Sequence, residues 1–118
     1  MTNAQDVFDV IDAMDVQALG NLLAGDATMV FGNGEPLIGK DAILAGCEAF
    51  STTVQGWRHH MVNEWTTGPD TITETEVTYT RLDTKEVTVP VVSIWRTQDD
   101  GLIRDYRVFF DLTPVYAP

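Results

Sequence analysis

The chain has 118 residues, of which 44% are hydrophobic, enough for one domain with a core but not for two. It carries 18 acidic and 7 basic side chains, which give a formal net charge of -11. That charge repels phosphate backbones and anionic lipid head groups, so nucleic acids and membrane surfaces are excluded as expected partners.

The first 25 residues predict two short helices. Asn3 or Asp6 can cap the first helix, because apolar residues recur at helical spacing from Val7 onward. Asp15 can cap the second helix, and Gly25 is a typical end signal.

The next segment predicts a strand pair and a third helix. Residues 27–31 form the first expected strand, and a turn rich in glycine leads to a second, very short strand at Leu37-Ile38. Lys40-Asp41 then opens a helix whose apolar residues share one face.

From residue 57 the pattern changes to strands rich in threonine, valine and aromatic residues. Pro90 predicts either a bulge or a locally unpaired position within one of them. Helices followed by an antiparallel meander are typical of an α+β domain, so the sequence predicts one such domain over residues 1–118. The expected strands span 57–66, 71–82, 86–97 and 102–112.

Three stretches resemble a known family: residues 31–43 (FGNGEPLIGKDAI), residues 57–61 (WRHHM) and residues 101–112 (GLIRDYRVFFDL). Together with the element order, they resemble the nuclear-transport-factor-2-like superfamily. The most similar branch is the SnoaL-like one, whose relatives include polyketide cyclases, limonene epoxide hydrolases and ketosteroid isomerases. The resemblance implies a cone of helices against a strongly bent antiparallel sheet, an apolar pocket, and no cofactor.

The expected pocket wall follows from strand alternation and from this resemblance. The resemblance also implies that the catalytic bases of two related enzyme classes are absent from this chain. Val108 stands where the epoxide hydrolases carry their catalytic aspartate, and Phe31 stands near the base of the ketosteroid isomerases. The predicted lining is Phe31, Asn33, Trp57, His59, Val89, Val91, Tyr106, Val108 and Phe110.

His59 is the first candidate catalytic residue. His59 and His60 must face opposite sides of a strand, and the apolar neighbours Trp57 and Met61 put His59 inside. A histidine suits proton transfer, although a core histidine with one hydrogen bond fits the same pattern. Tyr106 adds a hydroxyl on the pocket face. The two histidines do not form a metal site, because no third ligand has suitable spacing.

For each of three polar residues, two interpretations of its role remain open. Glu76 faces solvent by simple alternation, whereas the resemblance brings it into the pocket as a catalytic carboxylate. Asn33 resembles a pocket donor that holds a water, or is a turn residue between two glycines. Asp111 is a catalyst, or a cap or partner of Arg107 at the end of the last strand.

Two functions from different classes therefore remain open. The first is a cofactor-independent isomerase, cyclase or hydrolase acting on a hydrophobic carbonyl or epoxide compound, with His59, Glu76 and Tyr106 as catalytic groups. The second is a binding protein that holds an apolar ligand without converting it.

We also expect a homodimer through the convex sheet face, with Arg107 and Phe109 in the interface. A single cysteine, Cys47, and the absence of a signal-like N-terminus favour the cytoplasm.

Overall fold

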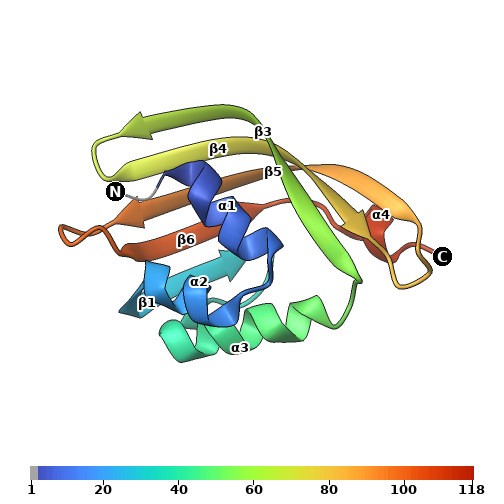
Figure 1. Cartoon of the computed structure of the whole chain (residues 1–118), viewed down its shortest axis with the longest axis horizontal. Coiled ribbons are helices and arrows are strands. Elements are labelled where there is room, and N and C mark those ends of the chain that lie inside the picture. The colour runs from blue at the N-terminus through green and yellow to red at the C-terminus, as the bar shows by residue number, and fades with distance from the viewer. Residues whose placement is uncertain (1–2) are drawn as a thin grey trace.

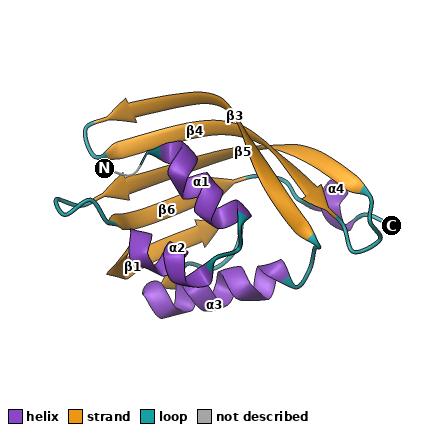
Figure 2. Ribbon diagram, in the orientation of Figure 1, coloured by secondary structure: helices purple, strands orange, loops and turns teal. Residues whose placement is uncertain are grey.

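A computed structural model describes residues 3–118 and has α+β architecture, as the sequence predicts. Three helices lie on one side of a strongly bent sheet, and the long strands β3, β4 and β5 run past them (Figures 1 and 2). In chain order, the elements are α1 (Ala4–Asp12), α2 (Val16–Leu22), β1 (Leu23–Phe31), β2 (Leu37–Ile38), α3 (Lys40–Ser51), β3 (Gly56–Thr67), β4 (Asp70–Thr80), β5 (Glu86–Thr97), β6 (Ile103–Phe109) and α4 (Thr113–Tyr116).

The helix caps confirm the local signals of the sequence. Asn3 accepts a hydrogen bond from the backbone of Asp6, and the Asp6 side chain bonds back to Asn3, which completes a capping box. Asp15 accepts from the backbone of Ala18 at the start of α2. The second helix ends earlier than predicted, because Leu23 already pairs with Ile103 of β6 as part of β1.

The sheet has the strand order β2-β1-β6-β5-β4-β3. The four long strands pair antiparallel in sequence order, which confirms the predicted meander, whereas β1 runs parallel to β6. Pro90 sits in register opposite Glu76 without a bulge, and the pairing of β5 with β6 begins only at Val92. Of the two predictions for Pro90, the locally unpaired position is therefore correct.

The core lies between the concave face of the sheet and the helices α1, α2 and α3 (Figure 2). Phe8, Leu23 and Ile43 are its largest fully buried side chains and come from two helices and the first strand. Burial alternates along β4, with Thr73, Thr75, Val77 and Tyr79 inside, so the intervening residues face outward. None of the helices in residues 3–118 is long and apolar enough to cross a membrane.

The last strand ends at Phe109, and a short helix that the sequence did not predict follows it. Asp111 is exposed and accepts hydrogen bonds from the backbone N–H and the hydroxyl of Thr113, at 2.9 and 2.6 Å. These hydrogen bonds hold the pKa of the Asp111 carboxyl below its usual value. Asp111 is thus a structural cap of the turn into α4, and Arg107 lies on the outer face, 6.0 Å from the Phe109 ring.

Candidate functional site

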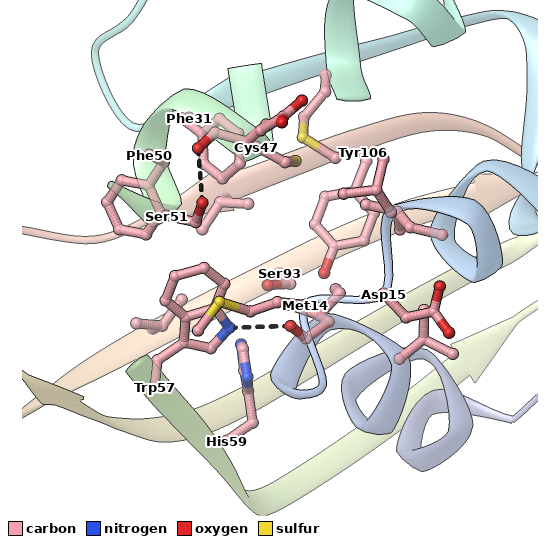
Figure 3. Close-up of a pocket in the computed structure, with 18 of the residues that line it drawn as sticks. Met14, Asp15, Phe31, Cys47, Phe50, Ser51, Trp57, His59, Ser93 and Tyr106 are labelled. Carbon is pink, nitrogen blue, oxygen red and sulfur yellow. Dashed lines mark hydrogen bonds between the residues drawn. The ribbon is translucent and has the colours of Figure 1, made fainter. Parts of the chain in front are cut away.

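A pocket opens between the concave sheet face and the helices, with a cavity volume of about 90 Å³. Helices α1, α2 and α3 with the turn between the first two form one side, and strands β1, β3, β4, β5 and β6 form the other (Figure 3). The lining is mainly aliphatic and aromatic: Val10, Ile11, Met14, Asp15, Val16, Leu19, Met29, Phe31, Cys47, Glu48, Phe50, Ser51, Trp57, His59, Tyr79, Val91, Ser93, Tyr106, Val108 and Phe110.

Many of the residues predicted from strand alternation and from the resemblance lie on the sheet side of this pocket. The reason is that inward residues of neighbouring strands are paired across the sheet, such as Ser93 with Val108 and Trp95 with Tyr106. The predicted residues that do line it are Phe31, Trp57, His59, Val91, Tyr106, Val108 and Phe110.

The structure does not bring Glu76 into the pocket, so its expected pocket position is wrong. Glu76 is exposed, because both neighbours along β4, Thr75 and Val77, point into the core. Strand alternation thus outweighs the family resemblance at this position.

Asn33 and Val89 also lie outside the pocket. Gly32 takes a backbone φ of 51°, which turns the chain away after β1 and leaves Asn33 exposed in the turn. Asn33 instead borders a shallow surface depression beside Asp111 and Thr113. Val89 is buried as predicted, but it packs in the hydrophobic core and does not line the cavity.

His59 is held at two points by Asp12, the last residue of α1. The Asp12 carboxylate accepts from the backbone N–H of His59 at 2.8 Å, and its second oxygen lies 2.6 Å from the ring Nδ1. An ionised carboxylate can only accept, so Nδ1 carries the hydrogen and the lone pair of a neutral ring is on Nε2. The Asp12–His59 pair therefore fixes the position and the tautomer of the imidazole.

Sequence reasoning missed Asp12. One signal was available, because a carboxylate in the last turn of a helix is unfavourable beside the negative end of the helix dipole. No basic residue in the last turn of α1 compensates it. Such a residue is expected to have a partner elsewhere, and here that partner is His59 on β3, one of the two edge strands of the sheet.

The rest of the His59 environment leaves one nitrogen free for a ligand. Phe8 stacks on the imidazole with ring centroids 4.3 Å apart, and the His59 side chain is only 10% exposed. Nε2 has no hydrogen-bond partner among the described residues, and no fully enclosed side-chain nitrogen or oxygen there lacks one. Nε2 is therefore accessible from the pocket that His59 lines.

Tyr106 supplies a neutral hydroxyl to the same pocket. Burial raises the pKa of its phenol well above the ordinary value, a rise that a hydrogen bond with Ser93 opposes and the charge of Asp12 reinforces. Tyr106 consequently stays protonated and can donate a hydrogen bond. Figure 3 shows the Tyr106 hydroxyl and the His59 ring both turned toward the pocket interior, near Ser93.

Aromatic rings from β1, α3, β3 and β4 form a continuous wall of the pocket. Phe50 lies 6.2 Å from Phe31, 5.3 Å from Trp57 and 6.1 Å from Tyr79, measured between ring centroids. The Trp57 indole donates to the backbone carbonyl of Ile11 at 3.2 Å, which fixes its orientation.

Cys47 lines the pocket without being a nucleophile. Burial raises the pKa of its thiol to about 11, so the reactive thiolate is scarce at neutral pH. Among residues 3–118, no three His, Cys, Asp or Glu side chains are grouped to hold a metal ion. The polar groups that line the pocket interior include His59, Tyr106 and Ser93, together with the hydroxyls of Tyr79 and Ser51.

A bent sheet covered by helices on one face, with an apolar cavity and a partly buried histidine, defines the class of cone-shaped α+β proteins. The family model of the SnoaL-like domain matches residues 4–106. The chain therefore belongs to the SnoaL-like domain family, and the family expected from the sequence is confirmed. No curated protein matches the chain.

Solved structures share the fold at low sequence identity. An NTF2-like protein of unknown function from Burkholderia pseudomallei has a TM-score of 0.86 and 16% identity, over 96% of this chain and 94% of that one. A candidate SnoaL-like polyketide cyclase from Jannaschia sp. CCS1 has a TM-score of 0.83 and 17% identity, over 97% and 89%. An LEH-like epoxide hydrolase from M. tuberculosis has a TM-score of 0.78 and 15% identity, over 95% and 82%.

Proposed function

We propose that this protein is a cofactor-independent proton-transfer enzyme, an isomerase or cyclase, acting on a small hydrophobic carbonyl compound. The observation that carries the proposal is the Asp12–His59 pair, which fixes the imidazole and leaves Nε2 accessible in an apolar pocket. A general base needs this combination of fixed geometry, correct tautomer and access to the substrate.

The proposed step uses two side chains. The substrate carbonyl oxygen accepts a hydrogen bond from Tyr106, and His59 Nε2 takes a proton from the adjacent carbon. The electron pair of that C–H bond forms the enolate, whose oxygen Tyr106 stabilises, while the Asp12 carboxylate stabilises the imidazolium. In an unsaturated ketone the enolate is conjugated with the C=C bond, so return of the proton from His59 to the far carbon shifts the double bond and isomerises the substrate. In a dicarbonyl compound, attack of the enolate carbon on the second carbonyl closes a ring, and the imidazolium returns its proton to the resulting alkoxide.

The relatives support this class of reaction without specifying it, since one structural neighbour is a candidate polyketide cyclase and another an epoxide hydrolase. Epoxide hydrolysis would require a held water in addition to the epoxide. The apolar Val108 occupies the position of the expected aspartate, and Asn33 lies outside the pocket. Among the interior groups are His59, Tyr106 and Ser93. They are sufficient to bind one carbonyl oxygen and to transfer one proton.

The test is proton exchange in D₂O with 1-indanone as a probe. We expect the protein to catalyse incorporation of deuterium next to the carbonyl, because the imidazole exchanges its proton with solvent between removal and return. Mass spectrometry measures the incorporation against a buffer control. Incorporation at the buffer rate with 1-indanone and with a set of further bound ketones would contradict the proposal.

An apolar binding protein is the second candidate function. The pocket lining is mainly aliphatic and aromatic, and neither Val108 nor Phe31 can act as a base. This alternative predicts tight binding of an apolar compound with no exchange or turnover.

We also propose that two copies associate through the outer sheet patch, defined as Trp65, Ile72 and Phe109. These side chains are 51%, 36% and 49% exposed. Glu74 and Arg107 flank them on the same face, on β4 and β6 respectively. A two-fold axis through the patch would bring the acidic side of one copy against the basic side of the other.

Replacing Phe109 with glutamate should convert the dimer to a monomer at micromolar concentration, because it removes a large apolar contact and buries a charge. Sedimentation velocity measures the change. Leu82→Glu is the matched control, since Leu82 is 62% exposed in the turn between β4 and β5 and should not affect association. A wild-type chain that sediments as a monomer would refute the dimer.

A further inference from the structure

The charged groups of the pocket all have one sign, His59 aside. Asp15 and Glu48 are its two carboxylates, and no lysine or arginine is among its lining residues. Asp15 comes from the turn between α1 and α2, and Glu48 comes from α3, so different elements bring the two charges to the cavity. Both residues are exposed, which places their charges at the solvent-facing part of the pocket.

Neither carboxylate is neutralised by the described part of the chain. Asp15 uses Oδ1 to cap α2, and Glu48 has no ion pair among residues 3–118. Asp12 adds a further carboxylate at the pocket wall, where it contacts His59. The field at the pocket is therefore negative, as is the whole chain at -11.

Two independent features indicate which kind of ligand binds in this negatively charged pocket. The cavity presents a continuous aromatic wall, which suits the apolar body of a ligand; the rings belong to Phe31, Phe50, Trp57 and Tyr79. In addition, His59 is about nine-tenths buried, and its Nε2 is unpartnered in this pocket. A ligand therefore passes the two carboxylates on its way into the pocket, and a polar atom of the ligand can reach His59.

We infer that the pocket selects ligands that carry a protonated amine on an apolar body, and that it rejects carboxylates and phosphate esters. The apolar body fills the cavity, while the ammonium group stays at the mouth beside Asp15 and Glu48. This inference depends on the proposed function in one respect, namely that the substrate also carries a carbonyl group. The preference for positive charge holds whether or not the ligand is converted.

A matched series of ligands measures this preference: 2-phenylethylamine, 2-phenylethanol and phenylacetate, which share a ring and differ in charge. NMR titration can follow the indole N–H of Trp57, which lines the pocket. At low ionic strength, we expect the amine to bind about tenfold more tightly than the alcohol, because two carboxylates at short range in water each contribute several-fold. Phenylacetate should bind more weakly than the alcohol, and salt should reduce both differences.

Two variants identify the groups responsible. Asp15→Asn preserves the cap of α2, since asparagine is an equally good N-cap, and Glu48→Gln preserves shape. Each should reduce the amine-to-alcohol ratio about threefold without changing the affinity for 2-phenylethanol. Glu35→Gln is the control, because Glu35 is exposed in the turn after β1 and outside the pocket.

Equal affinity for amine and carboxylate, or unchanged ratios in both variants, would overturn the inference. Failure of the proposed function has a separate signature, because it would abolish deuterium exchange and leave the charge preference intact. His59→Gln separates the two in the same way, since it should remove exchange and keep the preference for the amine.

Discussion

Replacing His59 with glutamine is expected to lower kcat/KM for a carbonyl substrate about 10²- to 10⁴-fold, the range for loss of a positioned general base. Glutamine keeps a hydrogen-bond donor for Asp12, which lies 2.6 Å from Nδ1, but it cannot accept and return a proton. Steady-state kinetics and the rate of deuterium exchange both measure the loss. The fold should be retained, because glutamine is of similar size and Phe8 keeps its packing against Trp95.

Two further variants sharpen this test. Glu76→Gln should leave activity unchanged, because Glu76 is exposed on the face opposite the pocket. Asp12→Asn should lower kcat at least tenfold and alter its pH profile, because Asp12 positions the imidazole and stabilises its charged form. Full activity in His59→Gln would eliminate the proposed base. A loss in Glu76→Gln as large as that in His59→Gln would show that the pocket geometry does not control the reaction.

Replacing Phe8 with alanine should lower the free energy of unfolding by about 3–5 kcal/mol. Phe8 is fully buried and contacts two aromatic partners, stacking on His59 and packing edge-on against Trp95 with centroids 5.7 Å apart. Since small domains have total stabilities of only about 5–15 kcal/mol, the variant is expected to lose a large fraction of its stability. Denaturant unfolding followed by circular dichroism measures the loss.

Phe8→Leu and Leu82→Ala are the controls for this prediction. Leucine fills part of the volume, so Phe8→Leu should cost clearly less than alanine. Leu82 is 62% exposed, so its truncation should change stability by less than about 0.5 kcal/mol. A cost for Phe8→Ala as small as that for Leu82→Ala would mean that α1 is not anchored to the sheet through this side chain.

The sequence alone predicted much of the local structure, because local structure depends on neighbouring residues. Of the two predicted starts of the first helix, Asn3 is the cap, and Asp15 caps the second helix as predicted. Period-two alternation put Tyr106 and Val108 on one face of the last strand, and the resemblance identified that face as the inner one. The same alternation predicted that Glu76 faces solvent. The resemblance misled at Glu76 and Asn33, because aligned positions share a fold without sharing the register or turn that directs a side chain.

Tertiary structure decided the arrangement of the site, because its contacts join residues far apart in the chain. Asp12 and His59 are separated by 47 positions, and a pattern with period two or 3.6 carries no information over that distance. The parallel pairing of β1 with β6 joins the two ends of the fold in the same way. The amino-acid sequence by itself determined which faces are apolar and that His59 lies inside, whereas only the packing of α1 across β3 supplied the carboxylate that orients it.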